Sequence, residues 1–440
     1  MSRAFRKRIG SVLELLEKAN EEIKLLLKEQ GRSETLQGLL ADCQEAAEAI
    51  GNAIEAVYGQ ETDLVRELEA YCENLYQLLN AENETILRKT QEGLTKQVGK
   101  LYELAGELLS DHLEVVFLPY KASMWDSMES VWNAARRDRR AKTYVIPVPY
   151  YDKNPDGSLG QMHYEIGLFP KEVPVVSYEM YNFELRQPDI IVIHNPYDDR
   201  NYVTTVHPYF YSDHLKKITE RLVYIPYFVL DGDGGDDYMG FALTPGVVHA
   251  DYVIVQNEKE RGSYLQYLEQ YYPQNNWRKK LLPLGSPKIE KVCSLDRDYS
   301  GIPEEWRERI AGKKVIFYNT TVGSLMQGKD TYLSKLENVF MMFREREDAV
   351  VLWRPHPLME ATISSMFPEL KERYQNLREW FVKEQIGILD ETPDMYGAIA
   401  VSSAYYGDWS SVLWLYKETG KPAMVQSINQ RCLVKQEGWV

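Results

Sequence analysis

Apolar side chains recur at alternating steps of three and four residues through the first hundred or so positions of the chain. Four such seams follow one another, at residues 12–26, 36–57, 64–78 and 94–108. This spacing is typical of helices that pack side by side along a heptad seam. Short breaks separate the seams, so the sequence predicts antiparallel helical hairpins in a bundle or coiled-coil arm.

The pattern changes near Leu113, where short apolar runs begin to alternate with stretches of helical spacing. Strands are predicted at residues 114–118, 143–148, 190–194, 221–226, 250–256, 314–318, 349–353, 386–389 and 398–401. Strands that alternate with helices are typical of parallel α/β sheets. A break at residues 300–303 divides this part, so we expect a helical arm over residues 1–112 and two α/β domains over residues 113–300 and 301–440.

Composition and charge narrow the class of protein. A chain of 440 residues with a net charge of −15 is too long for one core and too acidic for a general nucleic-acid binder. Its four cysteines are scattered without metal-site spacing, so neither a metal nor a cofactor is predicted, and a reducing cytosol fits best. No signal peptide or membrane-spanning run is recognisable.

The chain starts with a basic segment, in which Arg3, Arg6, Lys7 and Arg8 precede the first heptad seam. Such a segment is attracted to anionic membranes, but a solvated helix end explains it equally well. We therefore expect a cytoplasmic protein that is either free or peripheral on the inner face of the cell membrane. The helical arm suggests assembly or docking, through a second copy or another partner.

Candidate chemistry follows two predicted strands. Arg354-Pro355-His356-Pro357 ends one of them, and Asp408-Trp409-Ser410-Ser411 leads from the other into a helix. The carboxyl ends of parallel strands line one crevice, where an arginine fork, hydroxyl groups and unpaired helix N–H groups suit a phosphate. The alternative is structural: Asp408 and the serines cap the helix, and Arg354 forms an ion pair at a strand end.

These motifs have counterparts in a known family. From about Ala250 to Gln426 the sequence resembles the CDP-glycerol glycerophosphotransferases, the teichoic acid primases and polymerases of Gram-positive bacteria. The matching pieces are Ala250-Asp251-Tyr252, Leu284-Gly285-Ser286-Pro287-Lys288, Arg354-Pro355-His356-Pro357, Asp408-Trp409-Ser410-Ser411 and Gly420-Lys421-Pro422, with Trp125-Asp126-Ser127 as a weaker echo. The helical arm is not covered.

The resemblance implies a glycosyltransferase-B architecture: two Rossmann-like domains with the nucleotide in the C-terminal one. It implies transfer of a glycerol phosphate, or a related polyol phosphate, from a CDP-activated donor to a hydroxyl of a cell-surface polymer or its lipid-linked precursor. The residues expected to bind the donor are Arg354, Ser410, Ser411, Gly285, Lys288, Asn319 and Thr320. Those expected to act in catalysis are His356, Asp408 and His194.

The sequence also departs from the family pattern. The family's Trp-His-Gly, whose histidine would serve as the base, is replaced by residues 224–228, which contain no histidine, and its Pro-Thr-x-Arg loop by Asn319-Thr320-Thr321. A further departure is that the chain ends at Val440, where related proteins usually continue into a helix that crosses back to the first domain. The remaining candidates for the base are His194, His207, Asp231 and Asp233.

These departures leave two alternatives open. One is a nucleotide-sugar glycosyltransferase of the same fold. The other is a family member that has lost catalysis and serves as a binding or assembly protein through its arm.

Overall fold

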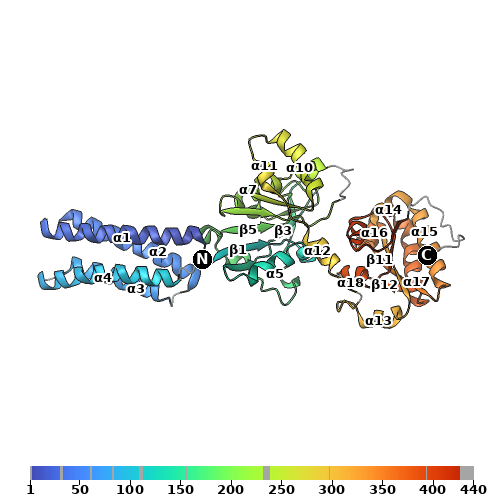
Figure 1. Ribbon diagram of the computed structural model, residues 1–440, viewed down its shortest axis with the longest axis horizontal. Coiled ribbons are helices and arrows are strands. Elements are labelled where there is room, and N and C mark those ends of the chain that lie inside the picture. Colours follow the sequence, from blue (N-terminus) through green and yellow to red (C-terminus); the bar gives the residue numbers. More distant parts are fainter. Residues whose placement is uncertain are drawn as a thin grey trace. The chain divides into compact units, whose positions relative to one another are not determined.

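The computed structural model describes residues 2–29, 33–59, 62–81, 84–108, 112–154, 156–230, 238–296, 298–392 and 394–426. Four long helices open the chain (Figure 1): α1 (Arg3–Glu29), α2 (Glu34–Tyr58), α3 (Asp63–Leu79) and α4 (Glu84–Leu108). Each packs against two of the others, which makes a four-helix bundle. The predicted seams form its core, as Leu16, Ile23, Ile54 and Leu101 are at most 1% exposed. The expected helical arm is thus confirmed.

The start of the bundle is tied to the α/β part by one buried carboxylate. Asp189 accepts a hydrogen bond from the backbone N–H of Arg3, at 2.8 Å, and another from that of Glu114, at 2.7 Å. The first caps α1 and the second fixes the start of the first strand. Beside it, Arg186 forms a two-pronged ion pair with the buried carboxylate of Glu114.

The first sheet has six strands in the order β2-β1-β5-β7-β8-β9. They are β1 (Leu113–Leu118), β2 (Ala141–Val145), β5 (Ile190–Ile193), β7 (Arg221–Tyr224), β8 (Tyr252–Val255) and β9 (Leu281–Pro283). The pairs from β2 to β8 are parallel, as predicted. The short helices of this part are η1 (Ala122–Ser127), α5 (Glu129–Arg137), η2 (Ile166–Leu168), η3 (Tyr178–Met180), α6 (Phe183–Arg186), η4 (Pro208–Phe210), α7 (Ser212–Leu215), α8 (Tyr238–Ala242), α9 (Pro245–His249), α10 (Glu258–Tyr271), α11 (Trp277–Lys280) and α12 (Pro287–Cys293).

A small antiparallel sheet accompanies the first one and was not predicted. Its order is β4-β3-β6, formed by β3 (Tyr150–Lys153), β4 (Leu159–His163) and β6 (Thr204–Val206). These strands are short and rich in polar residues, so they lack the apolar runs that identified the other strands.

The second sheet is parallel throughout, in the order β12-β11-β10-β13-β14. Its strands are β10 (Lys314–Thr320), β11 (Ala349–Pro355), β12 (Gly387–Leu389), β13 (Ala404–Gly407) and β14 (Ala423–Val425). Its helices are α13 (Glu304–Ile310), α14 (Val322–Gly328), α15 (Asp330–Arg344), α16 (Met359–Met366), η5 (Pro368–Leu370), α17 (Lys371–Lys383), α18 (Tyr396–Val401) and α19 (Ser411–Lys417). One apolar cluster around Trp353 and Phe340 covers one face, and another around Phe317 and Tyr405 covers the other. The predicted class, parallel α/β sheets behind a helical region, is thereby confirmed.

One predicted strand is wrong. Residues 398–401 belong to helix α18, and the strand is β13, which begins at Ala404. A short apolar run that is buried all round does not distinguish a strand from a helix turn. Here Asp394 starts the helix, because its carboxylate accepts a hydrogen bond of 2.6 Å from the backbone N–H of Tyr396.

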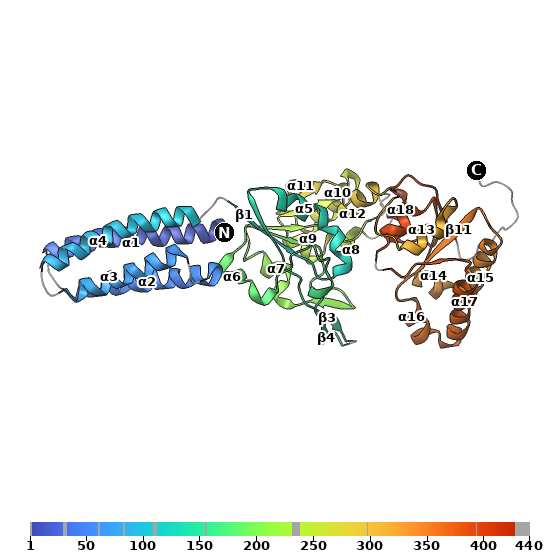
Figure 2. The same ribbon diagram turned by 90° about the horizontal axis from the view of Figure 1, so that it is seen from below.

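Figure 2 shows the same chain from a second side. The chain divides into two compact units, of which one comprises residues 1–122, 131–224 and 243–253, and the other residues 123–130, 225–242 and 254–440. The boundaries predicted at residues 112 and 300 remain a prediction. No helix within the described residues combines the length and apolar character needed to cross a membrane.

We expect Asp189→Ala to loosen the attachment of α1, because two charge-assisted hydrogen bonds are lost in a buried place. The free energy of unfolding of the first unit should fall by about 2–4 kcal/mol. Urea unfolding measures this loss, and hydrogen exchange at Arg3 and Glu114 locates it. The control is Asp213→Ala, which removes an exposed carboxylate from α7. Equal stability of the two variants would contradict the role given to Asp189.

Candidate functional site

The carboxyl edge of the second sheet brings together predicted residues from three neighbouring strands. Asn319 at the end of β10 is paired with Arg354 of β11 on one side and with Gly407 of β13 on the other. Asp408 follows directly, and its backbone N–H donates to the carbonyl of Asn319 at 2.9 Å. These residues therefore form one continuous edge within one unit.

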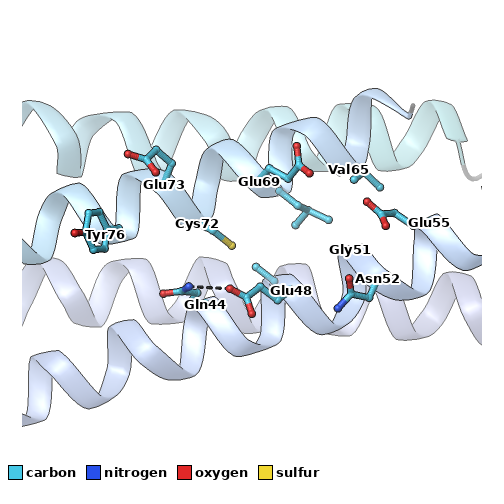
Figure 3. A pocket seen from close by; sticks show the side chains of 12 residues that line it. Gln44, Glu48, Gly51, Asn52, Glu55, Val65, Glu69, Cys72, Glu73 and Tyr76 are labelled. Carbon is cyan, nitrogen blue, oxygen red and sulfur yellow. Dashed lines mark hydrogen bonds between the residues drawn. The ribbon is translucent and has the colours of Figure 1, made fainter. Parts of the chain in front are cut away.

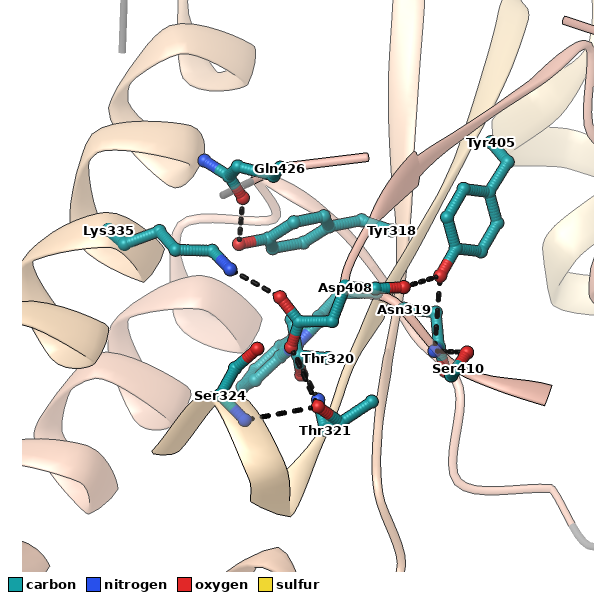
Figure 4. Close-up of polar contacts among 11 residues, drawn as sticks. Tyr318, Asn319, Thr320, Thr321, Ser324, Lys335, Tyr405, Asp408, Ser410 and Gln426 are labelled. Carbon is teal, nitrogen blue, oxygen red and sulfur yellow. Dashed lines mark hydrogen bonds and ion pairs between the residues drawn. The ribbon is translucent and has the colours of Figure 1, made fainter. Parts of the chain in front are cut away.

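The Asp408 side chain is buried and bonds to other residues of the same unit (Figure 4). Its carboxylate accepts a hydrogen bond from the backbone N–H of Thr321 at 2.6 Å, and forms an ion pair with Lys335 of α15. The side chains of Asp408 and Lys335 are 0% and 4% exposed. Two buried charges of opposite sign thus compensate each other and fix the loop that follows β10.

The serines divide between two positions. The Ser410 hydroxyl accepts from the backbone N–H of Leu413, at 3.4 Å, and from the Asn319 side-chain amide, at 3.1 Å. Ser410 therefore caps α19, as the structural alternative predicted. Ser411 is exposed on the first turn of α19. Thr320 is fully buried and accepts from the indole N–H of Trp353.

Part of the Arg354 guanidinium forms hydrogen bonds within the protein. Its guanidinium bonds the buried carboxylate of Asp390 at 2.6 Å, and also Thr392 and the carbonyl of Asp394, each at 3.4 Å. Within the described part of the chain, all three hydrogen bonds leave from Nη1. The Nη2 and Nε groups therefore remain for a ligand, and Asp390 fixes the plane of the fork.

His356 is exposed beside Arg354, and its protonation can be inferred from its contacts. Its Nδ1 accepts a hydrogen bond of 3.1 Å from the backbone N–H of Leu358, so Nδ1 carries no proton. Desolvation by nearby atoms lowers the pKa of His356, which keeps the ring neutral at pH 7. The proton of the neutral ring is then on Nε2, which makes His356 a hydrogen-bond donor rather than a base at that atom.

Lys288 and Gly285 form a second element. Gly285 adopts φ +97°, a conformation that favours glycine, two residues before the start of α12. The Lys288 ammonium is 9% exposed and bonds Asp126 at 2.8 Å, and the hydroxyl of Tyr396 donates to the same carboxylate. Tyr396 opens α18, which follows the segment that holds Arg354. Lys288 is thus linked to the sheet edge through the Trp125-Asp126-Ser127 motif.

The candidate bases lie elsewhere or outside the described residues. His194, directly after β5, is fully buried, and its Nε2 accepts from the backbone N–H of Tyr120 at 3.1 Å. His207 uses Nδ1 to accept from the backbone N–H of Tyr209 at 3.2 Å, and burial lowers its pKa. Asp231 and Asp233 lie outside the described residues. The catalytic roles of His194 and His356 stay predictions.

Two residues that matter at the edge were not predicted. The sequence gives a weak hint of the role of Asp390, because this residue directly follows a predicted strand. It gives no hint of the role of Lys335, because this residue stands among other charged residues in a helix and is 73 positions from its partner. Only the fold brings the two charges together.

The comparisons with known proteins agree with these motifs. Residues 242–431 match the family model described as CDP-Glycerol:Poly(glycerophosphate) glycerophosphotransferase, so the resemblance is confirmed over this part of the chain. All the predicted donor-binding residues lie inside it. No curated protein matches the sequence.

Several solved structures are weakly similar. The S. aureus MnaA–UDP co-structure has 12% identity, covers 71% of this chain and 78% of its own, and gives a TM-score of 0.46. A putative UDP-N-acetylglucosamine 2-epimerase from Listeria monocytogenes has 14% identity, coverage of 71% and 79%, and a TM-score of 0.45. The wall teichoic acid polymerase TagF has 15% identity, coverage of 83% and 79%, and a TM-score of 0.38.

We expect Lys335→Met to destabilise the second unit strongly, because Asp408 is left buried without its counter-charge. Breaking such a pair costs about 3–5 kcal/mol. Urea unfolding measures the loss, and Lys371→Met on the exposed surface of α17 is the control. The double variant Lys335→Met with Asp408→Asn should lose less than the sum of the single variants. Additive losses would show that the two side chains do not act as a pair.

Proposed function

We propose that this protein transfers a glycerol phosphate, or a related polyol phosphate, from a CDP-activated donor to a hydroxyl of a cell-surface polymer or its lipid-linked precursor. The proposal rests on the fact that the family match includes the sheet edge with its exposed donors. The family match covers residues 242–431, and within it the sheet edge gathers Arg354, His356 and Ser411 with groups turned to solvent or left for a ligand.

The chemistry asks for donors to the diphosphate and a base for the acceptor. In the transfer, the acceptor oxygen attacks the phosphorus that bears glycerol, the bond to CMP breaks, and CMP leaves with the bridging oxygen. Arg354, through Nη2 and Nε, and His356, through Nε2–H, would donate to the phosphate oxygens as charge develops there. Ser411 would add a hydroxyl donor.

The other predicted residues fit supporting roles. Asp408, Asn319, Thr320 and Ser410 already bond to their own protein, so we assign them the positioning of the edge rather than contact with the donor. Lys288 would complete the site by acting on the nucleotide side, either directly or by holding Asp126. The base for the acceptor hydroxyl is left unassigned among the described residues.

One alternative is favoured by a specific observation. The family's Trp-His-Gly is missing, and both His194 and His207 use a ring nitrogen to accept from backbone N–H groups. A protein that binds the donor without turning it over would have these features. Binding of CDP-glycerol without release of CMP would identify that case, and preference for a UDP-sugar would identify a glycosyltransferase instead.

Calorimetric titration of CDP-glycerol tests the donor clamp, the name we give to Arg354, His356 and Ser411 as groups that bind the donor's phosphates. Charged hydrogen bonds contribute roughly 1.5–3 kcal/mol each, so Arg354→Ala should weaken binding about tenfold to a hundredfold or more, and Ser411→Ala less. Because Arg354 also compensates buried Asp390, the Ala variant should be less stable as well. Arg354→Lys keeps a charge for Asp390 but not the fork, so it should regain stability and not affinity.

The matched control is Arg378→Ala, which removes an arginine that is paired with exposed Glu391 on the same unit. Thermal melting first shows that each variant is folded. If folded Arg354→Lys binds CDP-glycerol as tightly as the wild type, the clamp is wrong.

We also propose that the helical arm docks the protein, to a partner or a second copy and to the inner face of the membrane. A groove of about 540 Å³ between α2 and α3 supports the first role (Figure 3), since Glu48, Glu55, Glu69 and Glu73 line it and would suit a basic partner. The basic start of α1 supports the second, since Lys7 and Arg8 are exposed.

The membrane role predicts that Lys7→Glu with Arg8→Glu sediments less with vesicles that contain anionic lipid. A basic residue near such a surface contributes about 1 kcal/mol, so binding should fall about tenfold or more. The control is Lys18→Glu with Lys28→Glu, which changes the charge of α1 equally but farther along the helix. An equal loss in both variants would point to net charge alone and against a basic docking end.

A further inference from the structure

The second sheet has a hollow at its amino edge, opposite to the edge that carries Arg354. Its volume is about 700 Å³, within the range of small-molecule sites. The first residues of three strands line it, Lys314 of β10, Ala349 of β11 and Ala404 of β13. The strand β10 has seven residues, so roughly 20 Å of sheet separates the two edges.

The floor of the hollow is apolar. Ile316, Met342 and Phe343 provide the larger side chains, and Ala349 and Ala404 leave the space between them. Helix α18 closes one side with Ala400. An amphiphile could therefore place a hydrocarbon or aromatic body against this floor and remove both surfaces from water.

The rim carries a positive charge that contrasts with the acidic chain. Of the charged residues that line it in the described part of the chain, Lys314, Arg346 and Lys421 are cations and Asp348 is an anion. Asp348 is already bound by Arg346, at 2.6 and 2.9 Å, and this pairing and Lys314 lower the pKa of the carboxyl. Lys421 is directed to the carbonyls of Ile399 and Ala400, at 2.8 and 2.9 Å. The rim therefore keeps a net positive charge at neutral pH, in a chain whose net charge is −15.

We propose that this hollow binds a single-chain amphipathic anion, a phosphate monoester or carboxylate on a hydrocarbon body. The apolar floor takes the chain, and the exposed ammonium of Lys314 meets the anionic head. The site is separate from the proposed donor site, and the inference does not depend on the activity proposed for that site.

The test is calorimetric titration of the full chain with dodecyl phosphate below its micelle concentration. Two further ligands separate the contributions: inorganic phosphate has the head without the chain, and dodecyl maltoside has the chain with an uncharged head. We expect dodecyl phosphate to bind at least tenfold more tightly than either. Equal binding of dodecyl maltoside would overturn the proposal, because the rim would then contribute nothing.

Two variants locate the ligand. Lys314→Glu should weaken the binding of dodecyl phosphate about tenfold. The control is Lys313→Glu, which changes a neighbour that does not line the hollow and should leave the binding unchanged. Ala404→Leu fills the floor, so it should weaken the binding of dodecyl phosphate and of laurate, the corresponding carboxylate, to the same degree. If Lys314→Glu and Ala404→Leu, both folded by thermal melting, bind as the wild type does, the site is elsewhere and the inference fails. CDP-glycerol binding should be unchanged by Lys314→Glu, which separates this result from that of the donor clamp.

Discussion

The ion pair between Lys335 and Asp408 is the interaction on which the candidate site depends. It joins α15 to the end of β13 and, through the backbone N–H of Thr321, to the loop after β10. Neither charge would be tolerated in so buried a place without the other. Arg354 and Asp390 form a second pair on the same edge. The edge is therefore built from two carboxylates, each compensated by a cation from another element.

This pairing has an electrostatic consequence for ligands. Two uncompensated carboxylates at the ends of β12 and β13 would repel a diphosphate, above all in a chain with a net charge of −15. Compensation removes that repulsion, and the unused nitrogens of Arg354 and the Nε2–H of His356 then make the exposed part of the edge attractive to phosphate. The internal pairs prepare the site, and the exposed donors would bind the ligand.

Much of the fold could be predicted because apolar spacing follows directly from helix and strand geometry. The seams of the bundle, the strands from β1 to β12 that carry apolar runs, apart from the short β9, and the meeting of Arg354 and Asp408 at one edge were all expected. Residues 398–401 were misassigned because their burial on every side hides the helical period. The strands β3, β4 and β6 were missed because they are polar, and the role of Lys335 because it depends on a contact 73 positions away.

The structure also shows how the predicted site residues are held. Asp408 and Ser410 were expected to face a ligand, and both bond instead to neighbouring parts of their own protein. A sequence shows which residue types stand at a strand end, but it does not show which of them turn inward. That choice depends on partners such as Asn319 and Lys335, which come from other strands and helices.

The central claim is that the edge around Arg354 binds the donor, and release of CMP from CDP-glycerol tests it most directly. The reaction contains vesicles that carry a lipid-linked saccharide acceptor, and chromatography measures the CMP. We expect the wild type to release CMP only when the acceptor is present, and folded Arg354→Lys to release CMP at least tenfold more slowly. Release at the wild-type rate by that variant, or none by a wild type that binds no cytidine nucleotide, would contradict the assignment of this edge as the donor site.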